Sequence, residues 1–155
     1  MSVGAGAIAP ARGDASTAWT PARAFLAASA LYHLVLGAVG FVADRTFPLS
    51  TAAAARADSE HIFGVFETNG WHSLAAVFLG VVSLYFVLRP HRARAAAIAI
   101  GASQLAVVVG LALWDPSVFL LASNGADQVI HSLTAIAGIG AGLLTRTETS
   151  ARYPD

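Results

Sequence analysis

Four long apolar stretches, separated by short polar segments, dominate the sequence. They cover residues 22–43, 69–88, 95–114 and 125–145. Each has roughly the 20 residues that a membrane-spanning helix needs. Pro21 suits the first turn of the first helix, and Asp44 and Arg45 end it. This stretch is longer than the apolar region of a signal peptide, and bulky Phe41 stands near its best cleavage point, so we interpret it as an uncleaved span. The pattern predicts an all-α protein, a bundle of four transmembrane helices.

The polar segments predict short connections. Ser50 precedes a run of alanines and predicts the cap of a short helix. Ile62, Phe63 and Phe66 recur at helical spacing, which favours a helix lying in the membrane interface. The other two connections are a short basic turn over residues 89–94 and a longer loop that follows Asp115-Pro116.

Composition supports a membrane protein. Hydrophobic residues make up 56% of the 155 residues and charged residues 12%, about half the charge of an average soluble domain. The net charge is zero, so no basic surface for nucleic acid is expected. The absence of cysteine excludes disulfides and thiol chemistry. The nine basic residues are all arginine and alanine is abundant, which is typical of a GC-rich bacterial genome.

The arginines predict the orientation of the spans. Seven lie on the side of the N-terminus and two on the other: Arg12, Arg23, Arg89, Arg92, Arg94, Arg146 and Arg152 against Arg45 and Arg56. Because cytoplasmic loops carry the excess of basic residues, we expect both termini to be cytoplasmic in a bacterial plasma membrane. The domain organisation expected is a flexible cytoplasmic tail over 1–20, a transmembrane domain over 21–146 and a second cytoplasmic tail over 147–155.

A short internal repeat suggests how the spans are arranged. The second and fourth spans each begin with an Asn-Gly pair, Asn69-Gly70 and Asn124-Gly125, and carry a histidine further on. Both would enter the membrane from the same side. The repeat therefore predicts two parallel helical hairpins related by an axis along the membrane normal.

Few polar side chains lie within the spans. They are His33, His72, Gln104 and His131, with Asp127 near an end. Helical spacing places them on faces rich in small residues: Ala30, His33, Gly37 and Gly40; His72, Ala76, Gly80 and Ser83; Ala97, Gly101, Gln104 and Val108; Asp127, His131, Ala135, Gly138 and Gly142. Small residues mark helix contacts in membranes. The polar side chains should therefore point into the bundle.

Helix capping explains part of this set. Asn69 and Asn124 are expected N-caps, with His72 and Asp127 three residues on, and Asn124 with Asp127 resembles a capping box. For His33, Gln104 and His131, hydrogen bonds between helices are the ordinary interpretation.

Chemical alternatives depend on the same residues. His72 and His131 are the nearest pair for haem ligation, but their spacing from the caps leaves them about 6 Å apart in depth at about 1.5 Å per residue. A divalent metal would need His72 and His131 with Asp127 and Glu67. A proton relay or small-solute pathway would use His33, Gln104 and His131. No phosphate-binding loop, catalytic triad or HExxH motif is present.

The chain resembles a bacterial four-helix membrane family known as a domain of unknown function. The resemblance covers about Arg23 to Leu144 and rests on the segments Gly64 to Leu74 and Asn124 to His131. It implies the four-helix fold and the polar cluster, and it implies no reaction. The family pattern has a second histidine four residues after His72, where this chain has Ala76.

We therefore expect a small, non-enzymatic integral membrane protein. Its partners are expected to be the lipid bilayer and other membrane subunits or further copies of itself, as an accessory or scaffold subunit. No cofactor is required. The alternatives are a haem- or metal-binding redox protein using His72 and His131, and a small-solute or proton transporter lined by His33, Gln104 and His131.

Overall fold

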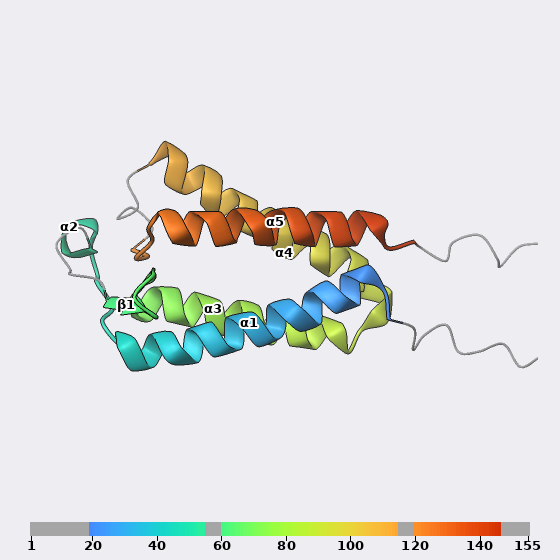
Figure 1. Ribbon diagram of the computed structural model, residues 1–155, viewed down its shortest axis with the longest axis horizontal. Coiled ribbons are helices and arrows are strands. Elements are labelled where there is room, and N and C mark those ends of the chain that lie inside the picture. Colours follow the sequence, from blue (N-terminus) through green and yellow to red (C-terminus); the bar gives the residue numbers. More distant parts are fainter. Residues whose placement is uncertain (1–18, 55–59, 115–119, 147–155) are drawn as a thin grey trace, which may run out of the picture.

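Four long helices lie along one another and form the body of the protein (Figure 1). The computed structural model describes residues 19–54, 60–114 and 120–146. The helices are α1 Pro21–Ala43, α3 Gly70–Val87, α4 Pro90–Leu113 and α5 Gly125–Leu144. Each is long and apolar enough to cross a membrane, which confirms the four predicted spans. The predicted tails lie outside the described residues, except for residues 19 and 20.

One predicted connection is wrong. Residues 89–94 do not form a turn, because α4 begins at Pro90 and includes the basic residues that follow. Proline fits the first position of a helix, where its missing N–H has no partner to lose. The connection between α3 and α4 is therefore very short, and His91, Arg92 and Arg94 lie on the first turns of α4.

In the segment between α1 and α3, the structure confirms the predicted short helix, but the predicted interfacial helix is wrong. Ser50 caps α2, Thr51–Ala54, by accepting a hydrogen bond from the Ala53 N–H. The interfacial helix expected around residues 60–66 is instead a hairpin of β1, Glu60–Ile62, and β2, Phe66–Thr68, with Ile62 paired to Phe66. Phe63 and Gly64 both have positive φ. Two successive residues with positive φ are typical of a tight hairpin turn. Because the chain reverses direction here, Ile62, Phe63 and Phe66 do not share one face of a helix.

The four helices pack as two antiparallel pairs, α1 with α3 and α4 with α5. Small residues allow this close approach: a Cβ added at Gly37 would lie 2.8 Å from the Ser73 carbonyl oxygen, and one at Gly101 would lie 2.9 Å from the Ala135 carbonyl oxygen. The predicted inward faces are confirmed, since their small residues are buried. The small-residue faces are therefore used within the chain.

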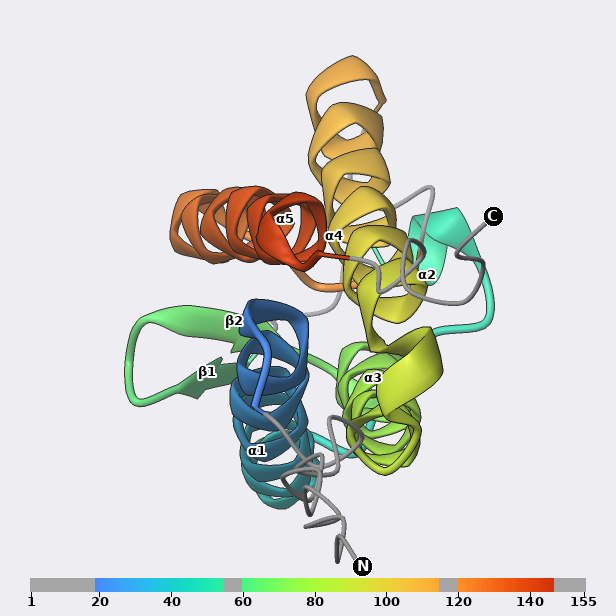
Figure 2. The same cartoon turned by 90° about the vertical axis from the view of Figure 1, so that its right-hand side faces the viewer.

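The two ends of the bundle differ in character. At the end where α3 and α5 begin, which we name the capped end, the β-hairpin and the segment before α5 lie over the helices (Figures 1 and 2). At the opposite, terminal end, the Ala22 N–H donates a 2.9 Å hydrogen bond to the Thr145 hydroxyl oxygen, so α1 begins where α5 stops. A buried apolar cluster fills the terminal half: Ala22, Leu26, Ala93, Ala96, Ala97 and Ile100.

Candidate functional site

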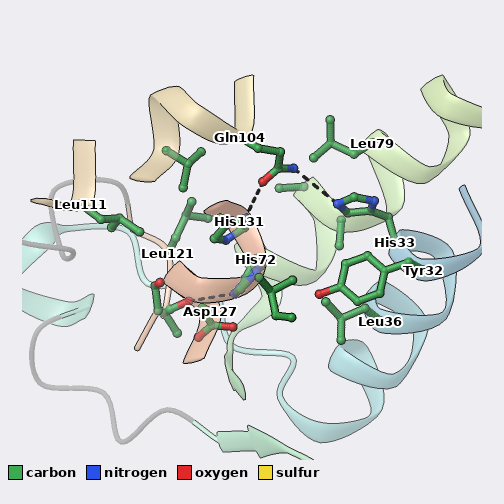
Figure 3. A pocket seen from close by; sticks show the side chains of 16 residues that line it. Tyr32, His33, Leu36, His72, Leu79, Gln104, Leu111, Leu121, Asp127 and His131 are labelled. Carbon is green, nitrogen blue, oxygen red and sulfur yellow. Dashed lines mark hydrogen bonds between the residues drawn. The ribbon is translucent and has the colours of Figure 1, made fainter. Parts of the chain in front are cut away.

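A cavity lies between the two helix pairs, in the half of the bundle towards the capped end (Figure 3). Its volume is about 70 Å³, enough for a few water molecules or a small polar group. All four long helices and the segment before α5 contribute to the wall. We name this cavity the chamber; its polar lining consists of Tyr32, His33, His72, Gln104, Ser123, Asp127 and His131.

A hydrogen-bonded series links the four helices across the chamber. His131 on α5 bonds through Nδ1 to the Gln104 side-chain oxygen on α4. The Gln104 amide nitrogen lies 3.4 Å from Nε2 of His33 on α1. His33 Nδ1 donates to the Ser29 carbonyl oxygen at 2.8 Å, and the Ser29 hydroxyl lies 3.1 Å from that of Ser83 on α3. Each helix supplies at least one side chain, so the series fixes the two pairs relative to each other.

The acceptors in this series determine where the imidazole hydrogens lie. His33 Nδ1 faces a carbonyl oxygen, so it carries the hydrogen and its Nε2 accepts from Gln104. The Gln104 oxygen is then turned to His131, whose Nδ1 must donate. His72 Nδ1 also donates to a carbonyl oxygen, that of Ala122, at 2.8 Å.

His72 and His131 therefore both use Nδ1 for a hydrogen bond to the protein, and both leave the Nε2 atom of the ring free. Their rings lie nearly parallel across α3 and α5, with planes at 28° and centroids 6.1 Å apart. In each neutral ring, Nε2 has a bare lone pair. Neither Nε2 atom has a hydrogen-bond partner among the described residues. Two acceptors are therefore left without donors at the chamber wall.

Ser123 adds a third polar group of this kind. Its hydroxyl oxygen is buried and has no hydrogen-bond partner within the part of the chain that the structure describes. Ser123 also lines the chamber. A hydroxyl can donate and accept a hydrogen bond. A buried hydroxyl without a partner lowers the stability of the fold by about 1–3 kcal/mol. The chamber wall therefore holds two imidazole acceptors that a small ligand could reach, and beside them a hydroxyl that is buried out of reach of a water-sized molecule.

The capped end is closed by two reciprocal hydrogen bonds between the helix pairs. Asn69 caps α3 and donates through its amide to the Leu120 carbonyl oxygen at 2.9 Å. Asn124 caps α5 and donates to the Val65 carbonyl oxygen at 2.7 Å. Each carbonyl stands four residues before the opposite asparagine. This exchange follows the approximate two-fold symmetry that the Asn-Gly repeat predicts.

The next residues repeat the exchange. His72 bonds the carbonyl of Ala122, two residues before Asn124. Asp127 accepts from the N–H of Glu67, two residues before Asn69, at 3.2 Å. Asp127 also accepts from the Asn124 N–H at 2.9 Å and so completes a capping box. His72 and Asp127, each three residues after a capping asparagine, thus connect the two helix pairs by hydrogen bonds and also line the chamber.

Substitutions at Asn69 separate its two roles. Asn69→Asp keeps the oxygen that accepts from the His72 N–H but loses the amide donor to Leu120, whereas Asn69→Ala loses both. Because aspartate caps about as well as asparagine, we expect Asn69→Ala to lower the unfolding free energy by about 1–2 kcal/mol and Asn69→Asp by about half as much. Unfolding in mixed detergent micelles, followed by circular dichroism, measures both. No loss in Asn69→Asp would show that the bond to Leu120 contributes nothing, and equal losses in the two variants would show that the cap contributes nothing.

The structure brings together the polar residues that the sequence singled out, with the exception of Glu67. His33, His72, Gln104, Asp127 and His131 line the chamber, and Asn69 and Asn124 lie at its capped end. Sequence reasoning missed three polar residues: Tyr32, Ser29 and Ser123. Ser29 stands one helical turn before His33, a spacing that could have indicated its role. Nothing local marks Ser123.

The four-residue metal set is not assembled. Among residues 19–54, 60–114 and 120–146, no three His, Asp or Glu side chains are arranged to hold a metal ion. Glu67 instead has its side chain 3.9 Å from His61, on the opposite strand of the β-hairpin. Asp127 is engaged by two backbone N–H groups.

Comparison with known proteins identifies a family without identifying an activity. No curated protein and no solved structure matches the chain. One family model matches residues 23–144, most of the chain and all four long helices. The chain belongs to this family, which is described as a domain of unknown function (DUF4383).

Proposed function

We propose that this small membrane protein binds a small hydrogen-bonding molecule in the chamber. The observation that carries the proposal is a pair of acceptors at one cavity that have no partner among the described residues: the Nε2 atoms of His72 and His131. Each imidazole is held by a hydrogen bond from its Nδ1 atom to the protein. The two Nε2 atoms are therefore fixed in place before a ligand binds. Such pre-organisation lowers the cost of binding.

The chamber is a poor match for haem. Pockets for drug-sized ligands start at roughly 300 Å³, whereas the chamber measures about 70 Å³. A porphyrin would therefore have to push the helix pairs apart and break the series through Gln104. The size of the chamber therefore argues against a redox function through bound haem.

A proton relay is also disfavoured, because Gln104 interrupts the series. Gln104 lies between His131 and His33 as an amide, with its oxygen accepting and its nitrogen donating. An amide in that role holds two imidazoles in orientation but does not pass a proton between them as a hydroxyl or water would. Of the transport alternatives, small-solute passage remains compatible with binding in the chamber.

The accessory-subunit or homo-oligomer hypothesis loses its main support. It depended on small-residue helix faces, and those faces pack within the chain, as at Gly37 and Gly101. The apolar side chains that remain exposed are large, for example Leu31, Phe78 and Ile136, and they suit contact with lipid.

We further propose that both chain ends are cytoplasmic in a bacterial plasma membrane. The excess of arginine near the terminal end supports this orientation. The chamber would then lie in the outer half of the bilayer.

Trifluoroethanol, a small hydroxyl donor, tests the proposed binding. With the protein in nanodiscs, we expect saturable broadening of the fluorine NMR line, because the probe hydroxyl donates to Nε2 of His72 or His131. The double variant His72→Leu with His131→Leu should lose this broadening, and His91→Leu, an exposed histidine at the terminal end, should keep it. Trifluoropropane, which has no hydroxyl, should give none. Equal broadening in the wild type and the double variant would overturn the proposal.

A further inference from the structure

A second hollow lies beside the chamber on the lipid-facing surface. This groove has a volume of about 530 Å³ and is lined by Trp71, Leu74, Ala75, Phe78, Leu120 and Leu121. The four α3 residues recur at helical spacing and so form one face. Towards the capped end, α4 diverges from α3 (Figures 1 and 2), and Leu74 and Phe78 on this face of α3 are exposed.

The groove and the chamber share a wall. Ala75 and Leu121 line both hollows. Ala75 stands one helical turn after His72, so a short step along α3 leads from the apolar groove to an unsatisfied Nε2 atom. The methyl group of Ala75 is the smallest side chain available at such a position apart from glycine. The shared residues therefore place the chamber, with its few polar groups, directly beside an apolar groove on the lipid-facing surface.

The free groups of the chamber specify the chemistry of a head group. His72 and His131 each offer an acceptor, the Nε2 atom of a ring held by its Nδ1 hydrogen bond. A hydroxyl on the ligand suits these acceptors, because it donates a hydrogen bond to an imidazole nitrogen. The size of the chamber limits the head to a few heavy atoms.

Charge restricts the head group further. No arginine is among the described residues that line the chamber or the groove, and the Asp127 carboxyl group lies in the chamber wall. A carboxylate or phosphate head would meet Asp127 without a cation to compensate, which disfavours fatty acids and phospholipids.

We propose that the chamber and the groove together bind a membrane-soluble alcohol: a hydrocarbon chain lies in the groove and a small hydroxyl-bearing head enters the chamber past Ala75. This inference rests on the proposed function and names its ligand class. A hydrocarbon chain gains little by moving from lipid into an apolar groove, because both are apolar. The groove therefore orients the molecule, and the hydrogen bonds in the chamber select it.

Photolabelling with a hexadecanol that carries a diazirine in its chain tests this proposal. In nanodiscs of one phosphatidylcholine, we expect labelling of the α3 face between Trp71 and Phe78. Labelling should fall about tenfold in the His72→Leu, His131→Leu double variant, the effect of losing one or two hydrogen bonds. Ala75→Phe, which narrows the passage, should also reduce it. Ala102→Phe, a lipid-exposed site on α4 outside both hollows, should leave it unchanged.

Five further compounds, used in three comparisons, determine which part of the proposal fails, if one does. The corresponding diazirine hydrocarbon without a hydroxyl should label all variants equally; labelling as strong and as variant-dependent as that of the alcohol would overturn the role of the head. Stronger labelling by the matching hexadecanoic acid or hexadecylamine would overturn the hydroxyl class. Competition by decylhydroquinone or by dioctanoylglycerol distinguishes a quinol from a glyceride as the source of the hydroxyl.

The outcome with trifluoroethanol separates this inference from the proposed function. If trifluoroethanol binds and hexadecanol labelling does not respond to Ala75→Phe or to the histidine variants, the chamber takes a small solute and the alcohol proposal is wrong. If neither probe responds, both proposals are wrong. Circular dichroism of each variant checks that its helices are retained, and Ala75→Phe leaves every hydrogen-bonding residue of the chamber in place.

Discussion

Replacing Gly138 by leucine is expected to force α4 and α5 apart and to give the largest loss of stability of any single change considered. A Cβ at Gly138 would lie 2.9 Å from the Ala97 carbonyl oxygen and 3.0 Å from the Gly101 Cα. Both are backbone atoms, so no side-chain rotation relieves the contact. Overpacking of this kind costs about 1–3 kcal/mol or more, and we expect a clear fall in the unfolding midpoint in mixed micelles.

Gly140 provides the matched control on the same helix. A Cβ added there meets no atom within 4 Å, so Gly140→Leu makes the same chemical change in open space. Because leucine favours a helix over glycine by up to about 1 kcal/mol, its stability should be unchanged or slightly raised. Similar destabilisation by both variants would contradict the close packing of α4 on α5.

Gln104→Leu is expected to have the second largest effect, on stability and on the state of two histidines. Gln104 is almost completely buried, at 1% exposure, and it bonds both His131 and His33. Leucine keeps the volume but leaves an imidazole donor and an imidazole acceptor unpaired. Each buried unpaired group costs about 1–3 kcal/mol in soluble proteins, and less within membranes, so we expect a loss of about 1–3 kcal/mol.

Nitrogen NMR of the histidine rings distinguishes this role from simple packing. In the wild type, His33, His72 and His131 should all carry hydrogen on Nδ1, and in Gln104→Leu only His131 should lose this preference. The control is Gln128→Leu, because the Gln128 side chain makes no hydrogen bond within the described residues. An unchanged His131 spectrum in Gln104→Leu would contradict the bond between them.

Local sequence was sufficient where one physical property dominates a whole segment. Apolar runs of membrane length predicted the four spans, because a chain in lipid must satisfy its backbone hydrogen bonds within a helix. Small residues at helical spacing predicted which faces turn inward, as at Gly37 and Gly138. The caps at Asn69 and Asn124 follow from residue type and position alone.

Local sequence failed where distant residues decide the conformation. The aromatic spacing of residues 62–66 fits a helix, yet the segment is a hairpin that contacts α5 through Val65 and Glu67. These contacts come from Asn124 and Asp127, far along the chain. The turn expected over residues 89–94 was wrong for a different reason: proline is also compatible with the first position of a helix, and Pro90 begins α4.

The sequence by itself therefore determined that this protein is a four-helix membrane protein, which residues face the interior, and which polar side chains lie there. The tertiary structure alone decided how those side chains meet. The chain of bonds through Gln104, the paired rings of His72 and His131 and the shared wall at Ala75 each depend on atoms from different helices or connections. Hydrophobicity and helix periodicity are properties of neighbouring residues, whereas a cavity and its hydrogen bonds exist only once the two helix pairs have come together.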